Sequence, residues 1–144
     1  EAWDVLVTYG YLDSEYDDYI ADLTGDGIIT DNSDLVSRNT PENTFGLTTS
    51  YTAQIGNGDL RARVSYRWRD EMETNSSNDP LGHLDSIHNV NATISYSIQN
   101  YRVSVWGRNI TDEREQRWGT IGGLTTRGWW NEPSTYGVTV SASF

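Results

Sequence analysis

The sequence has no cysteine, and all ten of its basic residues are arginine. Without cysteine the chain cannot form a disulfide, a thiolate zinc site or a cysteine nucleophile. It also has no run of about 18 apolar residues, which excludes a transmembrane helix. A membrane β-barrel stays open, because a strand needs only about 9–11 alternating residues to cross the bilayer.

The charge is strongly negative, at -11 over 144 residues, and only 35% of the residues are hydrophobic. A net negative chain lacks the basic surface that nucleic acid requires. The region from Asp13 to Asp34 is dense in carboxylates, which predicts a long acidic loop. The two histidines, His83 and His88, are isolated, and no phosphate-binding glycine loop or nucleophile with a base is present, so we do not expect an enzyme.

The last eleven residues, from Ser134 to Phe144, read STYGVTVSASF and alternate between apolar and small polar side chains. A period of two places one set on each face of a β-strand. Aromatic residues, Tyr136 and Phe144, stand at the two ends of the apolar face, with aliphatic residues between them. Aromatic girdles around an aliphatic band are typical of a membrane-spanning strand.

The same pattern recurs along the chain. It predicts strands at about 2–12, 43–54, 60–69, 89–98, 101–109 and 134–144. Short turns at Gly56-Asn57-Gly58 and Gln99-Asn100 alternate with long connections at about 13–42, 70–88 and 110–133. This layout predicts an all-β fold: an antiparallel up-and-down transmembrane β-barrel segment of about six strands. The alternative is a secreted calcium-binding or carbohydrate-binding β-sandwich, which also has strands with connections of mixed length.

Arginines occupy the polar face of two predicted strands. They are Arg61, Arg63, Arg67, Arg69, Arg102 and Arg108. A row of arginines cannot form the core of a soluble domain, so we expect these side chains to face the water-filled lumen of a barrel. There they could guide anionic substrates or pair with lumen carboxylates.

The acidic loop contains the sequence Asp22-Leu-Thr-Gly-Asp-Gly-Ile28, which is similar to a calcium-binding loop. The oxygen ligands would be Asp22, Thr24, Asp26, the Ile28 carbonyl and Asp34. The match is incomplete, because position twelve is Ser33 and Asp34 stands one place late. Calcium binding and a turn-forming surface loop without a metal are both open from the sequence.

The last long connection is rich in tryptophan. Trp118, Trp129 and Trp130, together with Arg127, form a candidate ligand-binding group on an extracellular loop. An exposed indole can stack on a sugar or an aromatic ligand. Packing within the loop or contact with lipid headgroups is the alternative.

The stretch VSVWGRNITD at 103–112 and the ending at 133–144 resemble the C-terminal end of TonB-dependent outer-membrane receptors. The element Asn109-Ile110-Thr111-Asp112, followed by a long loop and a last strand with a terminal aromatic, carries the resemblance. Asn39-Thr40-Pro41 before the second strand is also similar to that family.

The resemblance implies that residues 1–144 are the C-terminal portion of a barrel of about 22 strands around a plugged lumen, with the plug domain and the earlier strands absent. It implies a location in the outer membrane of a Gram-negative bacterium. The implied function is uptake of a scarce nutrient, of the iron-chelate, glycan or cobalamin class. The implied partners are membrane lipid, the rest of the barrel and its plug, the TonB energy-coupling complex and a small-molecule or oligosaccharide substrate.

Overall fold

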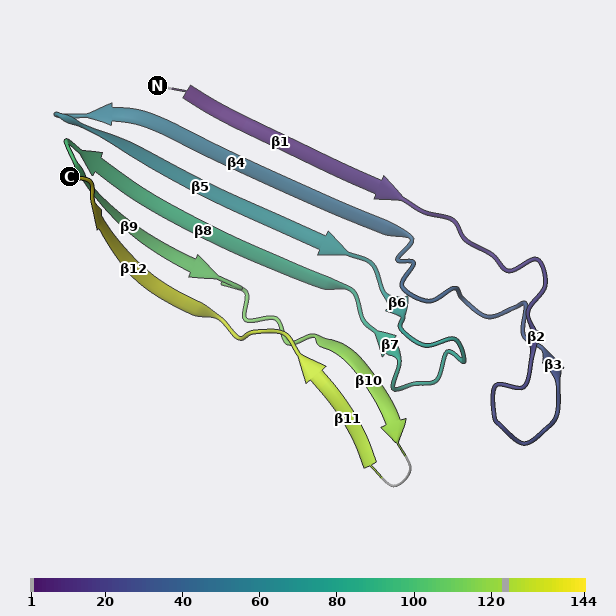
Figure 1. Ribbon diagram of the computed structural model, residues 1–144. Helices are drawn as coiled ribbons and strands as arrows, with labels where there is room; N and C mark the ends of the chain where they lie inside the picture. Colours follow the sequence, from purple (N-terminus) through teal and green to yellow (C-terminus); the bar gives the residue numbers. More distant parts are fainter. Residues whose placement is uncertain (1, 123–124) are drawn as a thin grey trace.

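One six-stranded antiparallel sheet makes up most of the protein (Figure 1). The computed structural model describes residues 2–122 and 125–144, and for residues 117–127 it describes the backbone only. No helix in the described residues is long and apolar enough to cross a membrane. The six long strands are β1 (Ala2–Tyr11), β4 (Asn43–Ile55), β5 (Gly58–Arg69), β8 (Ile87–Ile98), β9 (Tyr101–Arg108) and β12 (Thr135–Ala142).

The long strands lie side by side in the order in which they occur in the chain, β1-β4-β5-β8-β9-β12, and every neighbouring pair is antiparallel. Two tight turns join β4 to β5 and β8 to β9. Gly56 and Gln99 adopt positive φ angles of 61° and 50° in these turns. The three long connections all lie at the opposite end of the sheet from the tight turns and the two chain termini (Figure 1). The predicted up-and-down meander of six strands is therefore confirmed.

The long connections contain more regular structure than the sequence predicts. Each holds a short antiparallel pair: β2 (Ile20–Ala21) with β3 (Thr30–Asp31), β6 (Met72–Glu73) with β7 (His83–Leu84), and β10 (Gln116–Gly122) with β11 (Thr125–Trp130). Two-residue strands are too short to show alternation. The β10–β11 hairpin has glycines and an irregular register between Gln116 and Trp118, which hides the period of two.

The register assigns every long strand the same two faces. One row of paired residues runs Val5, Thr49, Val64, Ala92 across four strands, and the adjacent row of the opposite face runs Asp4, Ser50, Arg63, Thr93. Apolar side chains therefore share one face, named here the apolar face, and polar side chains share the other, named here the polar face. Cross-strand pairs such as Trp3 and Tyr51, with ring centroids 4.8 Å apart, add contacts within the apolar face.

No second layer covers the apolar face in the described part of the chain. Val5, Ile94 and Val140 on this face are 64%, 56% and 69% exposed, and the only buried hydrophobic residues described are Ala53 and Leu84. A β-sandwich would bury such a face against a second sheet. The structure therefore contradicts the sandwich alternative and leaves a sheet whose apolar face needs a nonaqueous environment.

Both edges of the sheet, β1 and β12, lack a partner strand among the described residues. Unpaired backbone groups cost several kcal/mol each in lipid, and an open edge promotes association in water. We therefore expect the 144-residue segment, produced by itself, to aggregate or to assemble through these edges. Size-exclusion chromatography and denaturant unfolding test this, and a dispersed monomer that unfolds cooperatively in aqueous buffer would contradict it.

Candidate functional site

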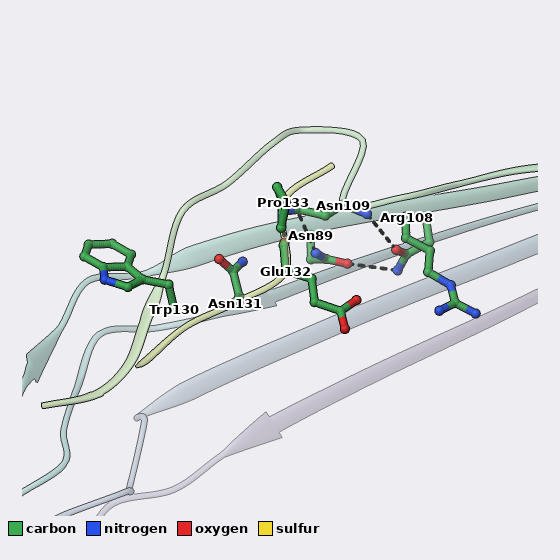
Figure 2. A pocket seen from close by; sticks show the side chains of 8 residues that line it. Asn89, Arg108, Asn109, Trp130, Asn131, Glu132 and Pro133 are labelled. Carbon is green, nitrogen blue, oxygen red and sulfur yellow. Dashed lines mark hydrogen bonds between the residues drawn. The ribbon is translucent and has the colours of Figure 1, made fainter. Parts of the chain in front are cut away.

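A polar depression of about 380 Å³ lies where the polar face meets the long connections (Figure 2). The ends of β8 and β9 and the return from β11 to β12 supply its walls. Its lining residues are Asn89, Asn91, Arg108, Asn109, Trp130, Asn131, Glu132 and Pro133. Trp130 and Arg108 stand at opposite ends of it, with Asn131 and Glu132 between them (Figure 2).

Asn109 organises the floor of this depression. The residue is 5% exposed and has a φ of 47°, a left-handed conformation that asparagine tolerates better than most residues. Its side-chain amide donates to the carbonyls of Glu113 and Glu132 at 3.0 and 2.9 Å. Its side-chain oxygen accepts from the Glu113 N–H and from the Asn89 amide, at 3.2 and 3.3 Å. One buried side chain thus joins the end of β9 to both sides of the last connection.

The residues after Asn109 extend the same junction. The Ile110 N–H donates to the Val90 carbonyl at 2.9 Å, and the Thr111 hydroxyl donates to the His88 carbonyl at 3.3 Å. The Asp112 carboxylate accepts the Ser134 N–H at 2.8 Å, and this bond, together with nearby Arg114, holds the pKa of Asp112 below its ordinary value. The Asn-Ile-Thr-Asp element is therefore a structural junction between β8, β9 and the start of β12.

Further contacts tie the three long connections to one another. Arg69 at the end of β5 pairs with Glu115 and donates to the carbonyl of Asp85 at 3.2 Å. The side chain of Asn78 both accepts from the Val36 N–H and donates to the Val36 carbonyl, at 2.7 and 3.0 Å. The connections thus form one continuous rim above the sheet.

His83 and Glu73 link β7 to β6 within this rim, with 2.8 Å between Nδ1 and a carboxylate oxygen. The hydrogen bond to Glu73 raises the pKa of His83 above its ordinary value. The contact therefore stabilises the hairpin fully when His83 is protonated, below its ordinary pKa, and this stabilisation is lost as the pH rises through the raised value.

The register places all the predicted arginines on the polar face: Arg61, Arg63, Arg67, Arg69, Arg102 and Arg108. Arg102 donates to the Ser97 hydroxyl at 3.0 Å, and the guanidinium of Arg108 lies 5.2 Å from the centre of the Trp106 ring. Arg69 pairs with Glu115. Among the described residues, no carboxylate lies within 4.0 Å of the guanidinium groups of the remaining predicted arginines, Arg61, Arg63, Arg67, Arg102 and Arg108. Asp4 and Asp59 are the acidic residues in the long strands, so this face carries an excess of positive charge.

A family model described as "TonB dependent receptor-like, beta-barrel" matches residues 1–110, which is most of the chain. The chain belongs to this receptor-barrel family. The match confirms the resemblance to this family, and it does so over residues that precede Thr111, Asp112 and the last strand. It is a family of bacterial outer-membrane receptors and not of enzymes, in agreement with the prediction from the sequence.

The chain is also similar in structure to a solved protein with which it shares little sequence identity. The crystal structure of the ferric yersiniabactin uptake receptor FyuA from Yersinia pestis superposes with a TM-score of 0.77 at 16% identity. The match covers 99% of this chain and 21% of FyuA, so the chain spans about a fifth of that receptor. At this identity the likeness shows the fold. A comparison with curated proteins found no match.

The structure describes only the backbone at two of the predicted ligand-binding residues, Trp118 and Arg127. Trp129 and Trp130 are 72% and 62% exposed at the end of β11. Successive strand residues point to opposite faces, and Trp130 lines the depression whereas Trp129 does not. The sequence did not single out Asn89, Asn91, Asn131 or Glu132, because each looks like an ordinary polar position at the end of a strand.

The acidic loop of the receptor barrel is held as a turn by its first aspartate. One oxygen of Asp22 accepts the Gly25 N–H at 2.7 Å and the other accepts the Gly27 N–H at 2.8 Å. These backbone bonds, the Gly27 bond foremost, hold the pKa of Asp22 below its ordinary value. No three acidic or histidine side chains in the described residues gather closely enough to hold a metal ion. The predicted set Asp22, Thr24, Asp26, Ile28 and Asp34 also includes a hydroxyl and a backbone carbonyl, so calcium binding stays a prediction.

Calorimetry on the full-length receptor can decide between the two interpretations of this loop. A turn without a metal predicts no saturable calcium heat at millimolar concentration. A calcium loop predicts heat that depends on Asp22, because each of its carboxylate oxygens keeps acceptor capacity beside its bond to the turn. The matched pair Asp22→Asn and Asp13→Asn separates loop binding from nonspecific charge effects. Calcium heat that Asp22→Asn abolishes and Asp13→Asn leaves intact would establish a calcium loop instead.

Proposed function

We propose that this chain forms part of the wall of an outer-membrane receptor that imports a scarce nutrient into a Gram-negative bacterium by TonB-dependent transport. The observation that carries the proposal is the single sheet with an exposed aliphatic face on one side and arginines on the other. The apolar face would contact membrane lipid. The polar face would line the lumen and face the plug, with Arg61, Arg63, Arg67, Arg69, Arg102 and Arg108 turned inward.

In this role, further strands and a plug domain would complete the receptor. β1 and β12 would pair with strands that this sequence does not contain, closing a barrel of about 22 strands. The plug would respond to the TonB energy-coupling complex through the region that precedes this segment. Nucleic acid is not an expected partner, because the long connections are acidic.

The substrate class is an iron chelate, a glycan or a cobalamin. FyuA, the solved structure with the same fold, is named as a ferric yersiniabactin receptor. The nutrient that this receptor takes up needs a direct measurement, because the fold is shared by receptors with different ligands.

Uptake by cells tests the proposal. A strain lacking the full-length receptor should lose accumulation of one labelled nutrient, tested among ferric siderophores, neutral oligosaccharides and cobalamin. A plasmid copy of the receptor should restore it, and a protonophore should abolish it while leaving binding at the cell surface. Uptake of every tested nutrient at wild-type rates in the deletion strain would contradict the transport function.

A further inference from the structure

A trough continues from the rim depression down the polar face along β9. A second depression, lined by Asn91, Thr93, Trp106, Gly107, Arg108 and Thr139, shares Asn91 and Arg108 with the first. The two depressions adjoin at these residues and are together named here the β9 trough, from Trp130 at the rim to Trp106 below it. The lower part, from Trp106 to Arg108 along β9, spans about 7 Å at about 3.4 Å per residue. The depression next to Trp130 lies beyond it.

Trp106 forms a flat platform at the lower end of the β9 trough. Its ring leans across to β12, where a Cβ added at Gly137 would clash with the ring, so the indole packs directly on the glycine backbone. The indole N–H donates to the Thr139 hydroxyl at 3.2 Å, which fixes the ring plane. One side of the ring therefore rests on β12, and the Arg108 guanidinium lies over the ring, 5.2 Å from its centre. Trp106 and Arg108 thus form one stacked pair at this end of the trough.

The polar groups of the β9 trough balance in charge. Arg108 contributes a positive charge and Glu132 a negative one, and no oppositely charged group lies within 4.0 Å of either in the described residues. The amides of Asn89, Asn91 and Asn131 line the wall and keep spare donor and acceptor positions beyond their internal hydrogen bonds. The trough therefore offers both donors and acceptors between two indoles, without net charge.

We infer that the β9 trough binds a neutral oligosaccharide, with one sugar face stacked on Trp130, a further sugar against the Trp106–Arg108 pair, and hydroxyl groups bonded to Glu132, the outer N–H groups of Arg108 and the asparagine amides. The inference rests on the proposed receptor function and names its substrate class. A sugar ring presents an apolar face and a rim of hydroxyls, which matches aromatic platforms separated by amides and charged groups. Because Arg108 and Glu132 balance each other, the trough itself gives no electrostatic preference to an anionic ferric chelate.

Binding to the purified full-length receptor in detergent tests the inference. The probes are neutral α-glucan, β-xylan and chitin hexasaccharides, with a ferric catecholate siderophore and cobalamin as the competing classes. We expect one oligosaccharide to bind, and Trp130→Ala to raise its Kd by about tenfold or more, the loss typical of a buried aromatic anchor. Trp129→Ala is the matched control, because this neighbouring indole is also largely exposed and lies outside the β9 trough. The Kd should change by less than about twofold in this variant.

The shift of the folded receptor band on heating shows that each variant is folded before binding is measured. Trp130→Phe keeps an aromatic face and should retain part of the affinity. The inference is overturned if no oligosaccharide binds, or if Trp129→Ala and Trp130→Ala change the Kd equally. In that case, protonophore-sensitive uptake of a siderophore or cobalamin would leave the receptor function standing, whereas loss of all receptor-dependent uptake would remove the proposed function itself.

Discussion

Val64→Arg is expected to impair insertion of the receptor into the outer membrane by about 2–4 kcal/mol, the cost of an arginine on the lipid face of a barrel near the bilayer midplane. Val64 lies in the middle of β5, between Thr49 of β4 and Ala92 of β8, and its side chain is 42% exposed on the apolar face. An arginine there would place an unpaired charge in hydrocarbon. The fraction of full-length receptor in the heat-modifiable, folded form measures the effect.

Ser65→Arg is the matched control for this prediction. Ser65 is the next residue on β5, but it lies on the polar face opposite Thr48 and Asn91, in the same column as Arg63 and Arg67. A further arginine at this position enters a face that already holds arginines, so folding should be close to wild type. Equal losses of folded receptor for the two variants would contradict the assignment of the faces.

Asn109→Asp is expected to loosen the last long connection by about 2–6 kcal/mol, since two carbonyls lose their donor and each buried group left without a partner costs roughly 1–3 kcal/mol. The substitution keeps the size of the side chain but removes its amide hydrogens. The carbonyls of Glu113 and Glu132 then lose their donor and face a carboxylate instead. Hydrogen exchange of the Glu113 and Asn131 amides measures the local opening, and it should accelerate while exchange in β5 stays unchanged.

Asn57→Asp provides the comparison for this change. Asn57 lies exposed in the tight turn between β4 and β5, where the same chemical replacement should alter stability by less than about 0.5 kcal/mol. Similar exchange rates in Asn109→Asp and Asn57→Asp would show that the Asn109 side chain does not hold the connection.

The sequence by itself determined the six long strands, their order and their faces. A strand repeats its side-chain direction every two residues, so the alternation from Val5 to Tyr11 or from Leu60 to Trp68 assigns each residue to a face without knowledge of the neighbours. The tight turns at Gly56 and Gln99 make the strands that they join direct neighbours. Long connections that alternate with these turns then predict a meander. The Asn-Ile-Thr-Asp element and the last strand also carry enough family signal to predict the receptor barrel.

Only the tertiary structure decided which residues of the long connections contact one another at the loop end of the sheet. The contacts of Asn109 with Glu132, of Arg69 with Glu115 and of Val36 with Asn78 link residues far apart in the chain, so no local period predicts them. Trp129 and Trp130 look equivalent in the sequence, yet one lines the depression and the other does not. These outcomes depend on the register between strands and on how the connections fold back over the polar face, because contact between distant residues is set by the whole sheet and not by neighbouring side chains.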